Sequence, residues 1–285
     1  MNILDKICRS KRLEIAWQKE AIPLSELKEA VIPRLTRDPL KETLPITRGL
    51  RVKPAMTSIL KKVSFKEALI RSDSGIIAEF KRKSPSKGWI HPEADVASIV
   101  QSYEAAGAAA ISCLTDEPFF GGNFEDFKKA REAISRIPLL RKDFILDEYQ
   151  LYQSKAIGAD VILLIAACLT AEEIVRFTSI AHNLDMEVLL EIHDESELSS
   201  VCPDADVIGI NNRNLDTFVT DLRHSLDLVS RIPNNFVKIS ESGLSNPETV
   251  IKLRQAGFRG FLMGENFMKT SDPGGTLREF INQLN

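Results

Sequence analysis

Eight short apolar runs between residues 76 and 264 constrain the fold of this chain more than any other feature. They are continuously apolar rather than alternating, which is typical of parallel strands that are covered on both faces. They begin at Ile76, Ala109, Ile137, Val161, Glu187, Val207, Phe236 and Gly260. Because helical patterns separate the runs, the repeat predicts strands joined by helices in a (β/α)8 TIM barrel.

The segments between the runs supply the helices. Residues 96–103 and 124–134 each place their apolar side chains at helical spacing on one face, and Asn123 precedes the second segment as an N-cap. A glycine follows three of the helical patterns just before the next strand; these glycines are Gly107, Gly158 and Gly257. Glycine at this place adopts the left-handed conformation that ends a helix, so each one predicts a helix-to-strand connection.

A doubly wound sheet is the alternative architecture for alternating strands and helices. It would carry a glycine-rich nucleotide turn after an early strand, and the chain contains neither GxGxxG nor GxxxxGK(S/T). We therefore predict one α/β barrel domain spanning residues 1–285, of which about 1–70 form an N-terminal helical extension packed on the barrel.

The N-terminal extension has helical patterns of its own. Residues 3–8 indicate an amphipathic helix, and Ser25 to Ile32 indicate a second helix that Pro33 stops. Residues 44–56 are expected to form a basic, proline-containing loop, and residues 58–70 are helical again.

The composition excludes several classes of function. A net charge of −3 argues against a general binder of nucleic acids or membrane surfaces. The longest apolar run, Val161 to Leu169, is far shorter than the ~20 residues that span a bilayer, and the N-terminus lacks the apolar core of a signal peptide. The four cysteines lie far apart and form no CxxC motif, so we expect buried free thiols rather than disulfides or a zinc site. These features predict a cytoplasmic protein.

Polar side chains and glycines gather at the ends of the predicted strands. Because the C-terminal ends of barrel strands meet at one mouth, these residues form the candidate site. They are Glu79, Lys81, Ser84, Lys142, Glu191, Asn211, Arg213, Ser242, Gly243, Gly264 and Glu265. A lysine that faces a glutamate in a dry pocket can have its pKa moved towards neutrality, as proton transfer requires. The glycines after the last two strands would let backbone N–H groups approach a phosphate.

A solvated loop is the competing interpretation for any one of these residues. We favour function for Lys142 and Glu191, because each ends an apolar strand at the predicted mouth. Asn211 lies in a run of amides that is equally typical of a turn. The strand ends hold no cysteine and a single histidine, His193, which we expect to be a structural neighbour of Glu191. No transition-metal site is therefore expected.

Five motifs closely resemble the signature of the indole-3-glycerol phosphate synthase family. They are IIAEFKRKSPSKG (76–88), LLRKDFI (139–145), LLEIHDE (189–195), IGINNRNL (208–215) and ISESG (239–243). Their order and their spread over nearly the whole chain make the resemblance specific. The chain stops after one barrel, so we expect the single-function form, without a fused isomerase.

The resemblance implies a reaction and a substrate. The substrate is 1-(2-carboxyphenylamino)-1-deoxyribulose 5-phosphate, and the enzyme closes the indole ring with loss of CO₂ and water in tryptophan biosynthesis. The carboxylate and phosphate of the substrate would be received by Lys81, Arg82 and Lys83 after the first strand. No cofactor and no metal are implied. The expected partner is thus a phosphorylated small molecule; we expect a monomer, with an oligomer as the alternative.

The resemblance also implies catalytic roles by motif position. Lys142 is similar to the general acid that protonates the ketone oxygen, and Glu191 to a general base or electrostatic partner. Glu79 and Lys81 resemble a second acid–base and binding pair, used for the carboxylate and the dehydration step. Asn211 would orient the reacting groups.

The remaining matched residues would bind substrate. Ser84 and Arg213 would hold its anionic or polar parts. The phosphate would be cradled by Ser242, Gly243 and Gly264. Glu265 departs from relatives that carry serine there, and an ionised glutamate cannot donate a hydrogen bond to phosphate. We therefore expect its side chain to point away and its backbone N–H alone to contribute.

Two other functions stay open. A Schiff-base aldolase would use Lys142 as its nucleophile, and a non-catalytic barrel would bind phosphate compounds without turning them over. A phosphoribosylanthranilate isomerase is disfavoured, because the five motifs do not match that barrel.

Overall fold

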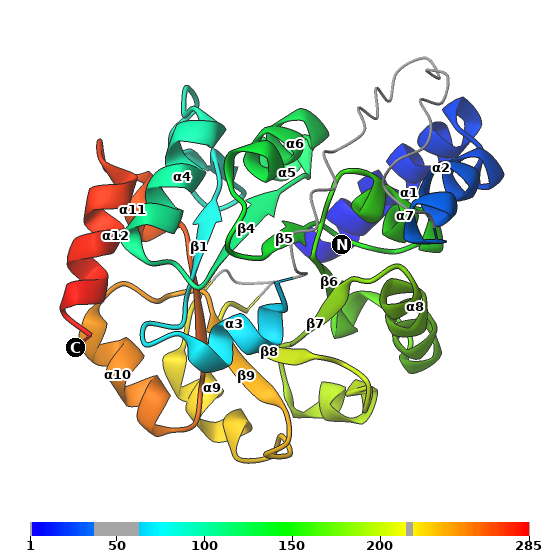
Figure 1. The fold of residues 1–285 in the computed structure, drawn as a ribbon. Helices are drawn as coiled ribbons and strands as arrows, with labels where there is room; N and C mark the ends of the chain where they lie inside the picture. The colour runs from blue at the N-terminus through cyan, green and yellow to red at the C-terminus, as the bar shows by residue number, and fades with distance from the viewer. Residues whose placement is uncertain (1, 37–62, 215–218, 285) are drawn as a thin grey trace.

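The computed structural model describes residues 2–36, 63–214 and 219–284, and it contains a closed parallel barrel with helices around it (Figure 1). All eight predicted strands are present, and the last one pairs with the first. In chain order they are β1 (Ile76–Phe80), β4 (Ala110–Leu114), β5 (Leu139–Lys142), β6 (Val161–Ile165), β7 (Glu187–Ile192), β8 (Val207–Asn211), β9 (Val237–Glu241) and β10 (Gly260–Met263). The predicted fold class is confirmed.

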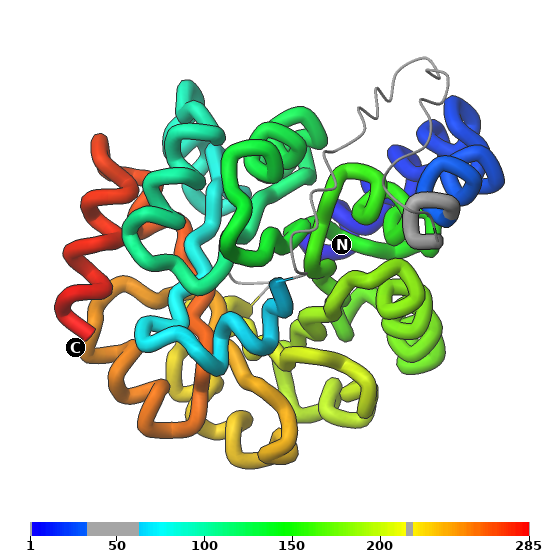
Figure 2. Tube along the Cα trace, viewed as in Figure 1, coloured from blue at the N-terminus to red at the C-terminus, as the bar shows by residue number. Residues whose placement is uncertain are grey.

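Helices follow the strands and surround the barrel, as the Cα trace in Figure 2 shows. They are α4 (Val96–Ala106), α5 (Glu117–Phe120), α6 (Phe124–Ala133), α7 (Glu148–Ala156), α8 (Ala171–Asn183), α9 (Leu222–Val229), α10 (Pro247–Gln255), α11 (Glu265–Met268) and α12 (Pro273–Asn282), with the 3-10 turns η1 (Ala166–Cys168) and η2 (Glu195–Ser200).

The predicted helix boundaries are confirmed at both kinds of cap. The Asn123 side chain accepts a hydrogen bond from the backbone N–H of Asp126 and begins α6. Gly107, Gly158 and Gly257 have φ values of 96°, 90° and 107°. These angles are unfavourable for residues with a Cβ atom, so the glycines allow the chain to leave each helix and enter the next strand.

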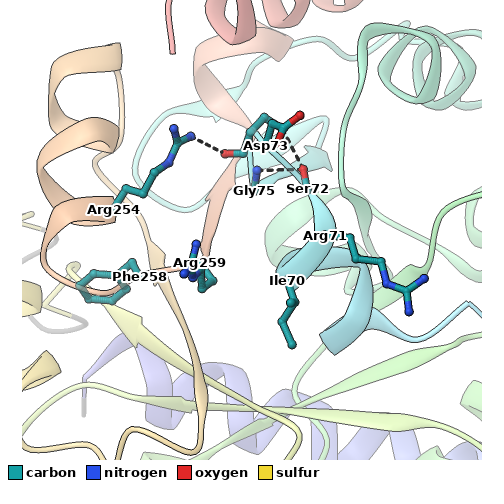
Figure 3. Close-up of a pocket in the computed structure, with 9 residues that line it drawn as sticks. Ile70, Arg71, Ser72, Asp73, Gly75, Arg254, Phe258 and Arg259 are labelled. Carbon is teal, nitrogen blue, oxygen red and sulfur yellow. Dashed lines mark hydrogen bonds between the residues drawn. The ribbon is translucent and has the colours of Figure 1, made fainter. Parts of the chain in front are cut away.

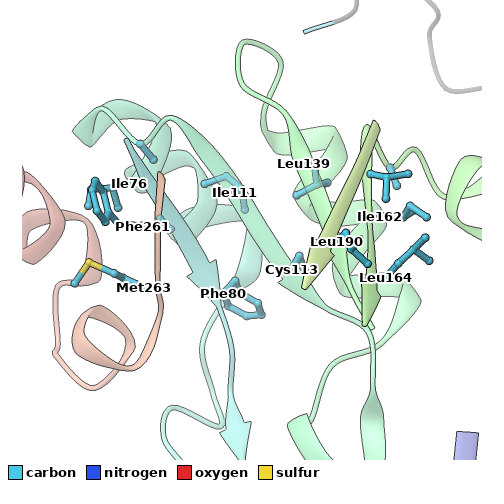
Figure 4. Close-up of a cluster of buried hydrophobic side chains, with 14 of the residues drawn as sticks. Ile76, Phe80, Ile111, Cys113, Leu139, Ile162, Leu164, Leu190, Phe261 and Met263 are labelled. Atoms are coloured by element: carbon cyan, nitrogen blue, oxygen red, sulfur yellow. The ribbon is translucent and has the colours of Figure 1, made fainter. Parts of the chain in front are cut away.

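Each strand is buried on both faces, in two separate apolar clusters. Figure 4 shows part of the cluster between the barrel and its helices, to which Ile76 and Ile111 belong. The second cluster fills the barrel interior and includes Ile77 and Leu140. Ile76 and Ile77 are adjacent but enter different clusters, because successive side chains of a strand point to opposite faces. This double burial explains why the sequence runs are continuously apolar.

Three helices precede the first barrel strand: α1 (Ile3–Ala21), α2 (Leu24–Thr36) and α3 (Phe65–Arg71). Phe65 and Leu69 of α3 are fully buried in the interior cluster, at the N-terminal end of the barrel. α1 and α2 pack against α7. There the hydroxyl of Tyr149 donates to the main-chain oxygens of Gln18, at 3.1 Å, and Ile22, at 3.0 Å.

The second helix of the N-terminal segment is longer than the sequence predicts. The expectation that Pro33 stops the second helix is wrong, because α2 continues to Thr36. The φ angle of proline is itself helical, so the chain can continue as a helix beyond Pro33 at the cost of one i→i−4 hydrogen bond. The predicted basic loop, residues 44–56, lies outside the described residues. The helix predicted over 58–70 is described from residue 63, and α3 begins at Phe65.

The loop after β1 contains a hairpin that the sequence did not predict. β2 (Lys83–Ser84) pairs with β3 (Gly88–Trp89) in antiparallel register. Its turn carries Ser86 and Lys87 to the C-terminal end of the barrel. Across the described part of the chain, no helix has the length and apolar character needed to cross a bilayer.

Candidate active site

A cavity of about 570 Å³ opens at the C-terminal ends of the barrel strands. It is lined by every residue of the predicted site: Glu79, Lys81, Ser84, Lys142, Glu191, Asn211, Arg213, Ser242, Gly243, Gly264 and Glu265. Ile3, Leu4 and Ile7 of α1 line it as well, so the N-terminal helix forms part of the cavity wall. The strands thus bring together residues that are far apart in the sequence.

Lys142 is the centre of the charged cluster in this cavity. Its Nζ donates to Glu191 Oε2 at 2.9 Å and to Glu241 Oε2 at 2.5 Å. The three side chains come from the ends of β5, β7 and β9. Asn211, at the end of β8, donates from Nδ2 to Glu191 Oε1 at 3.1 Å. One cation is therefore shared by two carboxylates, with an amide fixing one of them.

These groups control each other's protonation. Burial would lower the pKa of Lys142, but Glu191 and Glu241 raise it above its ordinary value, so the ammonium stays charged. Burial opposes ionisation of Glu191, yet Lys142 and His193 lower its pKa to about 2. Burial raises the pKa of Glu241 to about 7, and the negative charge of Glu191 adds to the rise. At neutral pH one carboxylate is ionised and the other is poised to exchange a proton.

Sequence reasoning missed Glu241 as a site residue. The sequence position of Glu241 could have indicated this role. Ile239 lies in the interior cluster, and Glu241 is two residues further along the same strand, so its side chain also points inwards. Gly209 on β8 makes room for this side chain, because a Cβ atom there would lie 2.3 Å from Glu241 Oε1. Gly264 does the same for Glu79, at 2.9 Å from Oε1.

Glu79 and Lys81 form a second ion pair at the end of β1. Lys81 Nζ lies 2.7 Å from Glu79 Oε1, and the Ser112 hydroxyl donates to the other carboxylate oxygen at 3.4 Å. Glu79 is buried, whereas the Lys81 side chain is 16% exposed. The cavity therefore holds two lysine–carboxylate clusters, from different strands.

Two further cations after β1, Arg82 and Lys83, do not line the cavity. Arg82 pairs with Asp126 on α6 and donates to the main-chain oxygen of Ala94. Lys83 donates to the main-chain oxygen of Pro118 and lies over the ring of Trp89. The expectation that Arg82 and Lys83 receive the substrate is wrong. The alternation of β1 turns Glu79 and Lys81 inwards and places Arg82 on the outer side.

The segments after β9 and β10, which the sequence predicts to hold a phosphate, both contribute residues to the cavity lining. Ser242 and Gly243 both have left-handed backbone, with φ values of 68° and 74°. Such a conformation is uncommon for serine and occurs mainly at functional sites or tight turns. Gly264 and Glu265 begin α11, and the first N–H groups of a helix lack intrahelical partners. Both segments line the cavity.

Asn211 makes a turn contact and also contacts Glu191 in the cavity. Its Oδ1 accepts the backbone N–H of Arg213 at 3.0 Å, which is turn chemistry, while its Nδ2 binds Glu191. Ser84 stabilises the hairpin, since its Oγ accepts the backbone N–H of Lys87 at 3.2 Å. His193 Nε2 lies 3.3 Å from Glu191 Oε1, as the expected neighbour.

A buried ionic network ties α1 to the barrel beside the cavity. Lys11 Nζ lies 3.1 Å from both Asp116 Oδ2 and Asp143 Oδ1, and its side chain is 1% exposed. Asp143 also accepts from Arg141 at 2.8 Å and from the Thr115 hydroxyl at 2.6 Å. Burial opposes ionisation of Asp143, but Lys11 and Arg141 lower its pKa to about 2. The network holds α1 on the barrel; Asp143 also lines the cavity, whereas Arg141 does not.

Aromatic residues that sequence reasoning did not select complete the cavity wall. Phe120 and Phe144 lie with ring centroids 6.0 Å apart, and both line the cavity. Leu114, Leu163 and Ile165 add apolar surface. Within residues 2–36, 63–214 and 219–284, no group of three or more His, Cys, Asp or Glu side chains is arranged to hold a metal ion.

A parallel barrel whose strand ends converge on charged side chains defines a (β/α)8-barrel enzyme with an acid–base site. Solved structures agree on the fold. The chain is similar to a 3-hexulose-6-phosphate synthase from Salmonella typhimurium, with a TM-score of 0.59 and 13% identity over 74% of this chain and 98% of that one. It is also similar to a thiamine phosphate pyrophosphorylase from Pyrococcus furiosus, with a TM-score of 0.54 and 16% identity over 75% and 95%.

Sequence comparison identifies the family. The profile of indole-3-glycerol phosphate synthase matches residues 36–280. An indole-3-glycerol phosphate synthase of Bacteroides thetaiotaomicron is 50% identical over 283 residues, covering 99% of each chain. One from Neisseria meningitidis serogroup B is 41% identical over 273 residues, covering 95% of this chain and 96% of that one. The chain belongs to the indole-3-glycerol phosphate synthase family.

Proposed function

We propose that the chain catalyses its family's reaction, the conversion of 1-(2-carboxyphenylamino)-1-deoxyribulose 5-phosphate to indole-3-glycerol phosphate. The reaction forms a carbon–carbon bond and releases CO₂ and water, so the enzyme is a carboxy-lyase of tryptophan biosynthesis. The observation that carries the proposal is Lys142, an ammonium held between Glu191 and Glu241 in the cavity. This cluster provides a proton donor and a proton acceptor within one site.

Lys142 is the general acid of ring closure. An ammonium has three N–H donors, and two of those on Lys142 are engaged by the carboxylates. The third can donate to the ketone oxygen of the substrate. Attack by the ring carbon that bears the carboxylate then forms the new bond, and the oxygen takes the proton. Loss of CO₂ from the same carbon restores the aromatic ring.

The carboxylates divide the remaining proton transfers. Glu191 is ionised and fixed by Asn211, so it stabilises the positive charge that develops near the reacting carbon. Glu241 titrates near neutrality and returns a proton to Lys142 after each turnover. Lys81 and Glu79 serve the dehydration: Lys81 protonates the leaving hydroxyl, and Glu79 accepts the proton from the adjacent carbon.

The remaining cavity residues bind and orient the substrate. The phosphate lies against Ser242, Gly243 and Gly264, with the backbone N–H of Glu265 as a donor and its carboxylate turned away. Ser84 and Arg213 hold polar groups of the chain that links phosphate and ring. The aromatic ring packs on Phe120 and Phe144, whose apolar faces suit a benzoate ring.

The raised pKa of Lys142 disfavours the Schiff-base alternative, because a protonated amine cannot add to a carbonyl. Borohydride treatment with substrate present should therefore leave no covalent adduct on Lys142. The binding-only alternative predicts that phosphate compounds bind and nothing turns over.

An indole fluorescence assay tests the proposed function. Purified protein, the carboxyphenylamino-deoxyribulose phosphate and EDTA should give growing indole fluorescence, and Lys142→Ala should remove most of it. A folded protein that binds the substrate but gives no fluorescence would overturn the proposal and every catalytic role above.

Three further features belong to this proposal. Residues 1–285 form one domain, in which about 1–70 are an extension packed on the barrel; the Lys11 network supports this arrangement. We expect the protein to act as a monomer, with an oligomer as the alternative. The free cysteines suit the reducing conditions of the cytoplasm.

A further inference from the structure

Two cysteines that are 160 residues apart in the sequence touch beside the candidate active site. The Sγ atoms of Cys8, on α1, and Cys168, at the end of η1, lie 3.5 Å apart. Both are free thiols. A disulfide bond has a sulfur–sulfur length of about 2.05 Å, so bond formation requires the sulfurs to approach by roughly 1.5 Å. Side-chain rotation of the two residues can supply much of that movement.

The pair joins two walls of the cavity. Cys8 follows Ile7, which lines the cavity together with Ile3 and Leu4. Cys168 is three residues beyond Ile165, the cavity-lining end of β6. A bond between the two sulfurs would therefore connect the helix that covers the cavity to the barrel strand below it.

Residues 2–10, which include the first turns of α1, form few polar contacts with the barrel. On the C-terminal side of Cys8, the buried Lys11 network holds the helix on the barrel. Lys19 does so as well, with its Nζ 2.7 Å from Asp147 Oδ2. Among the described residues, the Cys8–Cys168 contact is the only hydrogen bond or ion pair that links residues 2–10 to the barrel. Ile3, Leu4 and Ile7 supply apolar contacts here, so residues 2–10 are held to the barrel by fewer polar contacts than the rest of α1.

We propose that Cys8 and Cys168 form a reversible disulfide that fixes the first turns of α1 over the cavity and slows exchange of substrate and product. The oxidant is hydrogen peroxide. The Cys8 thiolate attacks a peroxide oxygen and becomes a sulfenic acid as water leaves. The Cys168 sulfur then attacks the sulfenic sulfur and a second water leaves. One hydrogen peroxide is reduced to two waters, two thiols are oxidised, and a dithiol reductant reverses the bond.

The surroundings of the two thiols indicate that the Cys8 sulfur reacts with peroxide first. The hydrogen bond that Cys8 shares with Cys168, together with the nearby Arg12, lowers the pKa of the Cys8 thiol. Lower pKa means a larger thiolate fraction and faster reaction with peroxide. By contrast, burial raises the pKa of Cys113, which is fully buried. Cys113 is therefore the matched unreactive control.

Peptide mapping tests the bond itself. The full-length protein is treated with hydrogen peroxide, free thiols are blocked, and the digest is searched for a peptide that joins Cys8 to Cys168. We expect this cross-link, a fall from four titratable thiols to two, and full reversal by dithiothreitol. Cys8→Ser and Cys168→Ser should each abolish the cross-link, whereas Cys113→Ala should keep it. Absence of the cross-link in the wild type would overturn the proposal.

Kinetics and hydrogen exchange test the consequence. Amide exchange in residues 3–10 should slow on oxidation. The kcat of the indole-forming reaction should fall at least about threefold, because opening of a covering segment limits many turnover numbers. Cys8→Ser should keep its activity after peroxide treatment. A cross-linked protein with unchanged exchange and unchanged kcat would refute the restraint on α1. The kinetic readout rests on the proposed function, but the peptide map and exchange decide the inference even if that function failed.

Discussion

A methyl group added at Gly209 should damage catalysis by displacing Glu241. The Cβ of Gly209→Ala would lie 2.3 Å from Glu241 Oε1 and 3.2 Å from Leu189 Cδ1. Carbon–oxygen contacts are normally about 3.3 Å or longer, so the carboxylate must move by about 1 Å. That shift disrupts its 2.5 Å contact with Lys142. Misplacement of about 1 Å can cost roughly 10²-fold in rate, and overpacking costs about 1–3 kcal/mol of stability.

The assay compares this variant with a matched clash away from the site. Gly260→Ala would place a Cβ 2.4 Å from Ile239 Cγ2, inside the barrel. Both variants should lose stability in urea unfolding. We expect only Gly209→Ala to lose kcat by about 10²-fold in the fluorescence assay. Adding Glu241→Asp to Gly209→Ala should recover stability, because the shorter side chain leaves room for the methyl group.

One result would refute this reasoning. If Gly209→Ala keeps the wild-type kcat while its stability falls as much as that of Gly260→Ala, the position of Glu241 does not matter for catalysis. The glycine would then be required for packing alone.

Three other predictions follow from the charged networks. Lys142→Ala should lower kcat by roughly 10²–10⁴ in the fluorescence assay; wild-type turnover would end its assignment as general acid. The pKa of Glu241 is raised to about 7, so its stabilising contribution is full below about pH 4.5 and is lost as the pH rises through 7. In urea unfolding, Glu241→Gln should lack this loss of stability. The same pH profile in wild type and variant would contradict the prediction. Lys11→Met should destabilise by about 3–5 kcal/mol, because it leaves buried carboxylates unpaired. The pKa of Asp143 is held at about 2, so stability is lost as the pH falls through 2; in Lys11→Met that loss should begin at higher pH.

Two carboxyl groups surround the single ammonium of Lys142, and this arrangement affects the protonation of the site when substrate binds. Glu191 and Glu241 both contact the single ammonium. An anionic substrate that enters the cavity adds further negative charge and favours the protonated form of Glu241. Substrate binding should therefore take up a proton near neutral pH, a change that calorimetry in buffers of different ionisation enthalpy would detect.

Local patterns in the sequence were sufficient for the elements and for much of the site. Strands with two buried faces must be continuously apolar, and helices that lead into strands need a residue such as Gly107 with left-handed backbone. Both requirements involve near neighbours in the chain. The mouth residues could also be predicted, because every strand of a barrel ends at the same rim. Lys142 is the last residue of β5 and Glu191 is the last but one of β7.

The tertiary structure determines which side chains contact each other. Lys142 meets Glu241 across 99 residues of sequence, and Cys8 meets Cys168 across 160. No local pattern specifies such partners, since they depend on strand register and on where α1 docks. Lys81 and Arg82 are both cations after β1, and the local alternation of the strand separates their directions. The partner of Arg82, Asp126 on α6, depends instead on where that helix packs. The sequence by itself determined which chemical groups reach the rim of the barrel, and the packing of distant segments determined which of them act together.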